Sequence, residues 1–201
     1  MGDVIGIVNY GIAGNIHSVK KAIDQAGGKT LVINKPSDFN LVDKLVIPGV
    51  GSFKDAMQEL ENDNFIELIQ EFDRPILGIC LGMQILSTIG FECGTTKGLD
   101  LIQAEVKPIV ANDVIPHMGF NTIDVINTNK ILYDLGCEEF YFMHSYSVVN
   151  FHDVSSTTTY GGHQFVSSIN NNNIYGVQFH PEKSREAGIK LFKNFINLEN
   201  A

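Results

Sequence analysis

A cysteine flanked by glycines inside an apolar run constrains the fold of this chain more than any other feature. The run is PILGICLGMQIL at 75–86, with Cys80 near its centre and a glycine two residues away on either side. The stretch from Pro75 to Ile79 is typical of a fully buried strand, and the apolar spacing from Leu81 to Ile89 predicts a helix. Glycines at a sharp strand-to-helix turn remove Cβ atoms that would clash. The pattern therefore predicts an elbow that holds the Cys80 side chain in an exposed, strained position.

Two interpretations of Cys80 follow. A free cysteine usually acts as a small buried hydrophobe. An elbow instead favours a nucleophile, because the N-terminus of a helix favours the thiolate and the backbone N–H of Leu81 points to where an oxyanion would form. The nucleophile also needs a base, which must come from elsewhere in the chain.

Composition and charge exclude several classes of function. The chain has 201 residues, 44% of them hydrophobic, and a formal charge of -9 with no run of Lys or Arg, so nucleic-acid binding is not expected. The N-terminus has neither a cationic stretch nor a long apolar segment, which predicts a cytoplasmic protein with no secretory signal and no membrane span. Cys80, Cys93 and Cys137 form no C-x-x-C pair, so neither a zinc site nor a disulfide framework is expected.

The first half of the chain alternates between strand and helix patterns. Strands are expected at 4–8, 30–33, 45–47 and 75–79, and helices at 16–26, 53–60 and 65–72, the first of them capped by Asn15. Such alternation predicts an α/β fold with a mostly parallel sheet flanked by helices. Its functional site is expected at the carboxyl ends of the strands, where Cys80 lies.

The second half is richer in strands. From Gln103 to Phe179 the clearest candidates are 140–149, 164–169 and 174–179, with the asparagines at 170–173 as a hairpin turn, and a helix at 186–198 closes the chain. No linker separates the halves. The sequence therefore predicts a single domain over residues 1–201, in which an antiparallel β extension continues the parallel sheet.

His180 is the candidate base among six histidines. It ends an apolar strand and precedes Pro181 and Glu182, and a proline pushes the residue before it toward an extended conformation. Side chains at positions i and i+2 of an extended segment lie on the same side, so Glu182 can reach one imidazole nitrogen while the other stays free. A histidine with a purely structural role is the alternative. The pattern favours a triad of Cys80, His180 and Glu182.

A glycine-rich turn at 48–52 supplies candidate oxyanion donors. It follows the strand at 45–47, and the backbone N–H groups of Val50 or Gly51 are expected beside that of Leu81. A simple connecting loop and a phosphate-binding loop are the alternatives. No P-loop lysine follows the turn, which argues against phosphate binding.

Together these motifs resemble the class I glutamine amidotransferases, in which a G-x-C-x-G elbow precedes a later His-Pro-Glu. The resemblance covers almost the whole chain. Within that class, several segments are similar to the glutaminase subunits of imidazole glycerol phosphate synthases: NYGIAGN at 9–15, PGVGSF at 48–53, GICLGMQ at 78–84, PHMGFN at 116–121, HSY at 144–146 and GVQFHPEKS at 176–184.

The resemblance implies a class I glutamine amidotransferase-like fold and hydrolysis of L-glutamine without a cofactor or metal. It also implies a heterodimer with a (βα)8 cyclase subunit, which uses the ammonia to make imidazole glycerol phosphate in histidine biosynthesis. Motif match makes Cys80 the nucleophile, His180 the base and then acid, and Glu182 its orienter. Positions around the glutamine are Gly51, Gln84, Ser145 and Tyr146, and positions at or near the cyclase are Asn9, Tyr10, Asn15, Met118 and Lys183.

One departure from the subfamily pattern leaves alternatives open. Members usually carry tryptophan where this chain has Phe120, and the chain contains no tryptophan. A paralogous subunit that feeds ammonia to an amidotransferase of surface sugars is therefore one alternative. A catalytically idle regulatory or binding subunit is another, although it would be expected to lose a triad member. A cysteine peptidase is the third alternative, and activity on peptides rather than on glutamine would distinguish it from a glutaminase.

Overall fold

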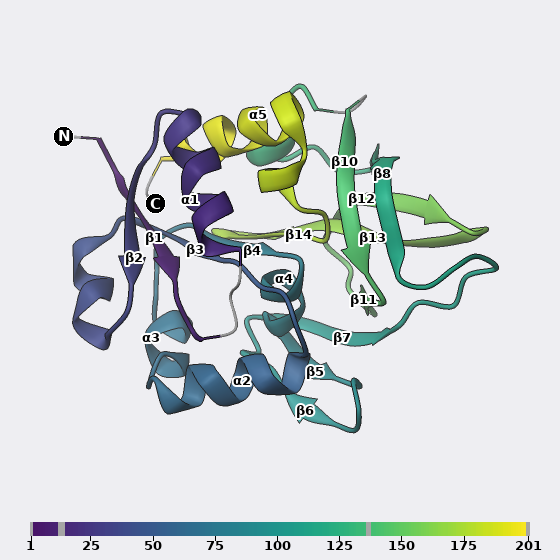
Figure 1. Cartoon of the computed structure of the whole chain (residues 1–201), viewed down its shortest axis with the longest axis horizontal. Coiled ribbons are helices and arrows are strands. Elements are labelled where there is room, and N and C mark those ends of the chain that lie inside the picture. Colours follow the sequence, from purple (N-terminus) through teal and green to yellow (C-terminus); the bar gives the residue numbers. More distant parts are fainter. Residues whose placement is uncertain (1, 12–14, 136–137, 200–201) are drawn as a thin grey trace.

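The computed structural model of the chain describes residues 2–11, 15–135 and 138–199. Its largest sheet has eight strands in the order β2-β1-β3-β4-β14-β13-β12-β9 (Figure 1). The neighbours from β2 to β14 pair in parallel, and those from β14 to β9 pair antiparallel. The strands are β1 Val4–Val8, β2 Lys29–Ile33, β3 Lys44–Ile47, β4 Ile76–Ile79, β9 Asp124–Val125, β12 Val154–Tyr160, β13 His163–Asn171 and β14 Ile174–Val177. The predicted α/β fold with an antiparallel extension is confirmed.

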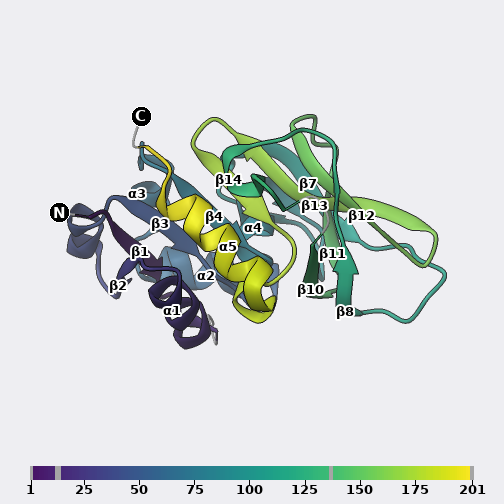
Figure 2. The same cartoon turned by 90° about the horizontal axis from the view of Figure 1, so that it is seen from above.

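Helices cover both faces of the parallel strands, whose nearly continuous apolar sequences suit burial on both sides. Helices α1 Ile16–Gln25 and α5 Arg185–Ile196 pack on one face, around Ile23, Leu191 and Phe192. Helices α2 Phe53–Asn62, α3 Ile66–Gln70 and α4 Leu81–Ile85 pack on the other. Figure 2 shows this helical half beside the strand-rich half. Among the helices that the structure describes, none has the length and apolarity needed to cross a membrane.

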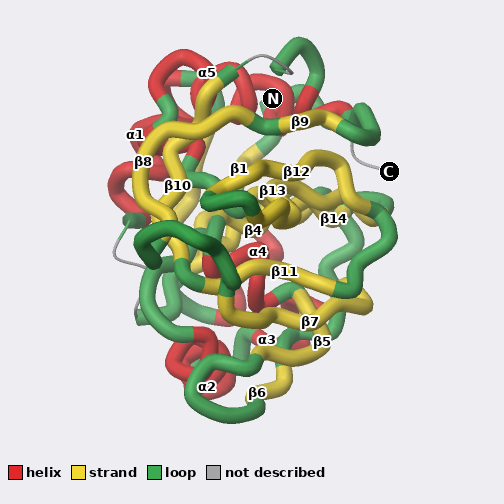
Figure 3. The backbone as a smooth tube through the Cα atoms, turned by 90° about the vertical axis from the view of Figure 1, so that its right-hand side faces the viewer, coloured by secondary structure: helices red, strands yellow, loops and turns green. Residues whose placement is uncertain are grey.

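Two smaller sheets complete the strand-rich half, which faces the viewer in Figure 3. One pairs β8 His117–Thr122 with β10 Glu139–His144. The other has the order β11-β7-β5-β6, built from β5 Ser87–Gly90, β6 Thr96–Lys97, β7 Ile102–Pro108 and β11 Tyr146–Val149. The 3-10 turns are η1 Pro36–Leu41, η2 Lys130–Leu132 and η3 Pro181–Lys183. The predicted asparagine turn joins β13 to β14, with Asn172 at φ 52°.

The helix predicted over Leu81 to Ile89 is wrong in its second half. Helix α4 ends at Ile85, and strand β5 begins at Ser87. The carbonyls of residues 85 and 86 accept hydrogen bonds from the backbone N–H groups of Leu99 and Leu101, so a distant segment replaces the bonds that would have continued the helix. The β-branched Thr88 and Ile89 suit the strand that follows.

The single strand predicted over 140–149 is two strands that belong to different sheets. Strand β10 ends at His144 and pairs with β8, whereas β11 begins at Tyr146 and pairs with β7. Both halves have strand-forming residues, so the sequence hides the change of partner. The break at Ser145 lies in the wall of the pocket described below.

Candidate active site

Cys80 lies in a strained turn between β4 and α4. Its φ is 53° and its ψ is -109°, a conformation that a residue with a Cβ rarely adopts, so the predicted strained elbow is confirmed. The prediction that the elbow exposes the side chain is wrong, because Cys80 is only 6% exposed and packs in the core cluster that contains Ile79 and Val177. Gly82 allows the turn, because a Cβ at that position would lie 1.8 Å from the backbone oxygen of Ile47. The Cys80 N–H donates to the Val177 carbonyl of β14 at 2.7 Å. The end of one parallel strand is therefore tied to its neighbour.

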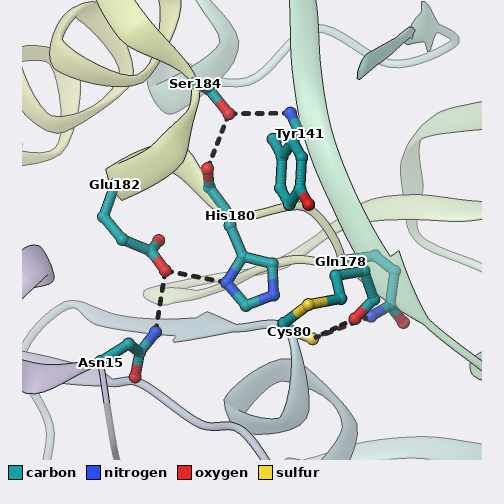
Figure 4. Close-up of polar contacts among 8 residues, drawn as sticks. Asn15, Cys80, Tyr141, Gln178, His180, Glu182 and Ser184 are labelled. Atoms are coloured by element: carbon teal, nitrogen blue, oxygen red, sulfur yellow. Dashed lines mark hydrogen bonds and ion pairs between the residues drawn. The ribbon is translucent and has the colours of Figure 1, made fainter. Parts of the chain in front are cut away.

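His180 and Glu182 meet at the end of that neighbouring strand. Nδ1 of His180 is 2.8 Å from Oε1 of Glu182, and both side chains are fully buried. His180 is extended as predicted, but Glu182 belongs to the 3-10 turn η3, so a turn rather than continued strand brings the two together. The imidazole lies between the Glu182 carboxylate and Cys80, and its Nε2 has no nitrogen or oxygen partner among the described residues (Figure 4).

Two further side chains hold this pair in place. Asn15 donates from Nδ2 to Glu182 Oε1 at 2.8 Å, and Ser184 donates from its hydroxyl to the His180 carbonyl at 2.6 Å (Figure 4). Asn15 precedes α1, but its side chain makes no capping hydrogen bond, so the predicted side-chain cap is wrong. Its amide supports the carboxylate instead. The ring and the carboxylate are therefore fixed by contacts from both ends of the chain.

Charges in this cluster favour a protonated histidine. Burial disfavours the imidazolium, but the charge of Cys80, followed by the hydrogen bond to the Glu182 carboxylate and its charge, outweighs burial and raises the pKa of His180 to about 10. Burial likewise opposes the Glu182 charge, but hydrogen bonding and attraction to His180, with help from Asn15, hold the pKa of Glu182 below its usual value. The arrangement therefore favours an imidazolium at His180 beside the Cys80 sulfur at neutral pH.

A pocket of about 190 Å³ opens beside the cysteine. It brings together every residue that the sequence predicted for the oxyanion and substrate sites. Its lining consists of Val50, Gly51, Cys80, Leu81, Gln84, Glu92, Pro116, Met143, His144, Ser145 and Tyr146. Gly51 has φ 111°, a left-handed conformation that suits glycine. No group of three or more His, Cys, Asp or Glu side chains is placed to hold a metal ion within the ranges described above.

The residues predicted at the partner interface fall into two groups. Met118 is 58% exposed and Lys183 is also exposed, while Asn9 is half-buried and donates from Nδ2 to Asn34 Oδ1 at 2.8 Å. Tyr10 and Asn15 are buried, and the Tyr10 hydroxyl donates to the Pro48 carbonyl. Their side chains therefore do not lie on the surface of this chain. Residues 12–14 of the same segment and Cys137 lie outside the described residues.

Sequence reasoning missed three polar side chains at the site. His144 and Glu92 line the pocket, and Gln178 donates from Nε2 to Cys80 Sγ at 3.6 Å. Strand alternation gave a signal for Gln178, because it lies two residues before His180. Glu92 follows β5 and accepts from the Phe53 N–H at 2.7 Å, a contact across 39 positions that no local pattern predicts.

Known proteins resemble this chain over nearly its full length. A sequence profile of the family described as "Glutamine amidotransferase class-I" matches residues 8–198. Imidazole glycerol phosphate synthase subunit HisH 1 of Campylobacter jejuni is 40% identical over 202 residues, which cover 97% of this chain and 100% of the relative. Subunit HisH of Lactococcus lactis is 42% identical over 197 residues, covering 96% of this chain and 97% of the relative.

Solved structures agree on the fold. A crystal structure of a glutamine amidotransferase has a TM-score of 0.74 at 15% identity and covers 96% of this chain and 99% of its own. The structure of PurLQS from Thermotoga maritima has a TM-score of 0.72 at 18% identity, with coverage of 98% and 99%. The chain belongs to the class I glutamine amidotransferase family and, within it, to the group of HisH subunits of imidazole glycerol phosphate synthase.

Proposed function

We propose that this protein hydrolyses L-glutamine to glutamate and ammonia through Cys80, His180 and Glu182. The observation that carries the proposal is the meeting of a strained cysteine with a buried, carboxylate-bound histidine beside one pocket. A purely structural cysteine would need neither the strain nor the histidine. An idle subunit would not be expected to keep the complete triad.

The chemistry follows from this arrangement. The Cys80 thiolate attacks the side-chain amide carbon of glutamine and forms a tetrahedral oxyanion. His180 then gives the Nε2 proton to the departing nitrogen, so that ammonia leaves and a thioester remains. The neutral imidazole next takes a proton from water, which attacks the thioester. Glutamate leaves, and the thiolate and imidazolium are restored. Glu182 fixes the ring and stabilises its positive charge.

The pocket walls supply the remaining roles in the proposal. The backbone N–H of Leu81, with that of Val50 or Gly51, serves as the oxyanion donor set. Ser145, Tyr146 and Gln84 surround the rest of the substrate. The Glu92 carboxylate is the acidic side chain in the lining, and it suits the α-ammonium group of an amino acid. Together these groups select a free amino acid rather than a peptide, whose α-nitrogen carries no charge.

The ammonia goes, in this proposal, to a (βα)8 cyclase subunit that makes imidazole glycerol phosphate for histidine biosynthesis, as a cytoplasmic heterodimer. The similarity to HisH subunits supports this partner. Exposed Met118 and Lys183 mark the face that would meet it. Phe120 is 38% exposed on the same strand as Met118, and the Arg185 guanidinium lies 4.5 Å from the centre of its ring.

Replacing Cys80 by alanine tests the chemistry. With the cyclase and its ligand present, we expect Cys80→Ala to abolish glutaminase activity, and Cys93→Ala to keep it, because Cys93 is exposed and is not among the residues that line the pocket. A diazo-ketone analogue of glutamine should label Cys80 and spare Cys93 and Cys137, as seen by mass spectrometry. Normal turnover by Cys80→Ala, or equal labelling of all three cysteines, would overturn the triad.

The identity of the partner has its own test. We expect a (βα)8 cyclase to co-purify with the tagged chain from its native cells and to stimulate glutaminase activity. Co-purification with an amidotransferase of surface sugars would replace the cyclase in this proposal and leave the glutamine chemistry intact.

A further inference from the structure

The sulfur of Cys80 has a polar neighbour outside the triad. The amide of Gln178 donates from Nε2 to Sγ at 3.6 Å, and the Gln178 side chain is fully buried. On another side, Sγ lies 3.8 Å from the Met143 carbonyl, which can only accept. A thiol can donate to Met143, whereas a thiolate can only accept, and Gln178 is then its amide donor. The two contacts therefore suit the two protonation states of the nucleophile.

One backbone carbonyl fixes which end of the Gln178 amide faces the sulfur. The Tyr146 oxygen can only accept, so Gln84 must present its nitrogen, which lies 2.9 Å away. The same nitrogen donates to Gln178 Oε1 at 3.0 Å, so Gln178 must present its oxygen to Gln84. The nitrogen of Gln178 is thereby turned toward Cys80. A reversed amide would place its nitrogen against the Gln84 nitrogen, which is also a donor, and its oxygen against the thiolate.

The Tyr146 carbonyl is itself held by a second buried donor. Nδ1 of His144 lies 2.9 Å from the same oxygen and must carry a hydrogen, so Nε2 accepts from Nδ1 of His117 at 3.3 Å. Burial lowers the pKa of His144 to about 3 and also lowers the pKa of His117, which keeps both rings neutral. His117 is stacked on Tyr160 with 4.1 Å between ring centres. Both acceptor positions of the Tyr146 oxygen are therefore occupied from fixed directions.

We propose that Gln178 stabilises and positions the Cys80 thiolate through its side-chain N–H, and that Gln84 and the Tyr146 carbonyl keep the Gln178 amide in the required orientation. This inference rests on the proposed glutaminase chemistry. The hydrogen bond is strong when the sulfur is charged and weak when it is acylated. It therefore favours the resting thiolate and also favours thiolate departure when water opens the thioester.

Alkylation of Cys80 by iodoacetamide as a function of pH tests the inference directly. The reagent reacts with the thiolate, needs no glutamine and no partner, and can be followed at Cys80 alone by peptide mass spectrometry. Gln178→Met keeps the side-chain length without the N–H. Gln164→Met, on the exposed side of β13, is the matched control.

We expect Gln178→Met to move the pH of half-maximal alkylation upward by about one unit, which corresponds to roughly tenfold slower alkylation at pH 7. In the complex with the cyclase, kcat for glutamine should fall about tenfold while KM stays within about twofold. Gln84→Met should shift the alkylation curve in the same direction by less, because Gln178 remains but is no longer oriented. Gln164→Met should match the wild type in both assays.

A folded Gln178→Met protein with the wild-type alkylation curve would overturn the inference. If Gln178→Met does not fold, Gln84→Met decides: an unshifted curve refutes the proposed orientation, and a shifted curve supports it. Failure of the underlying glutaminase proposal looks different, since Cys80→Ala would then retain turnover whatever the alkylation curves show.

Discussion

Replacing Gly82 by alanine tests whether the elbow depends on close approach of two backbone segments. A Cβ at this position would lie 1.8 Å from the Ile47 oxygen and 2.8 Å from its carbonyl carbon. Because real Cβ atoms essentially never come within 3.0 Å of another atom, α4 and β3 would have to separate by about 1.2 Å. Overpacking a core costs about 1–3 kcal/mol of stability. Here the obstacle is backbone that cannot rotate away, so we expect the free energy of unfolding to fall by about 3 kcal/mol.

The same displacement should impair catalysis. Cys80 leads into α4, and the turn carrying Val50 and Gly51 follows β3, so separating the two elements moves the nucleophile from its proposed oxyanion donors. A misplacement of about 1 Å can cost roughly 100-fold in rate. Thermal melting should show a decrease of about 6–12 °C for this chain length, and a glutaminase assay with the cyclase should show the loss of kcat.

Gly27→Ala is the control for backbone strain alone. Gly27 has φ 92°, and nothing lies within 4 Å of a Cβ built there, so its replacement should cost only about 1 kcal/mol. A Gly82→Ala protein that melts within about 2 °C of the wild type and keeps full activity would refute the packing requirement.

Three further outcomes are expected. The pKa of His180 is raised to about 10 in the folded protein, so its contribution to the free energy of unfolding is complete below the unfolded-state pKa of about 6.5 and is lost as pH rises through 10. The pKa of Glu182 is lowered in the folded protein, so its contribution is present above the unfolded-state pKa of about 4.3 and is lost in acid. Urea titrations should therefore show the largest penalty for Glu182→Gln between about pH 4.5 and 6.5, and a penalty independent of pH would contradict the pairing. Asn15→Ala should lower stability by about 2 kcal/mol and reduce kcat without weakening the cyclase complex. Weaker binding of the cyclase with unchanged kcat would instead support a role for Asn15 in the interface. Lys183→Ala should weaken cyclase binding, measured by calorimetry, more than it lowers basal hydrolysis, and the reverse order would count against its interface role.

The meeting of Cys80, His180 and Glu182 was predictable because each part has a local signature. A strand-to-helix turn with two glycines needs only five consecutive residues, and the His180–Glu182 contact spans only two positions. The parallel order of the strands then brings the two signatures together, since β4 and β14 are neighbours with Ile79 opposite Val177. Local rules combined with one topological rule were sufficient to predict that these three side chains lie together.

Contacts between distant segments explain what sequence reasoning missed. The end of α4 depends on residues 99 and 101, and the role of Asn15 depends on Glu182, which is 167 positions away. An asparagine before a helix is a good capping residue by local rules. Here a buried carboxylate accepts from Nδ2 of the same side chain, and this charge-assisted hydrogen bond orients the amide so that Oδ1 does not cap the helix.

Strand β8 connects the proposed partner face to the pocket, and this leads to a last prediction. Alternation exposes Met118 and Phe120, while His117 on the same strand is buried and reaches His144 in the pocket wall. A partner that displaces β8 must either break the 3.3 Å contact between the His117 and His144 rings or move His144 with it, and both change the pocket wall at Tyr146.

His117→Phe keeps the aromatic stacking and removes the hydrogen bond between the rings. We expect Met118→Ala and His117→Phe each to reduce the cyclase's stimulation of glutaminase activity, and the double variant to lose less than the two effects combined, with a coupling of at least about 0.5 kcal/mol. Strictly additive losses would mean that the partner acts on the pocket by another route.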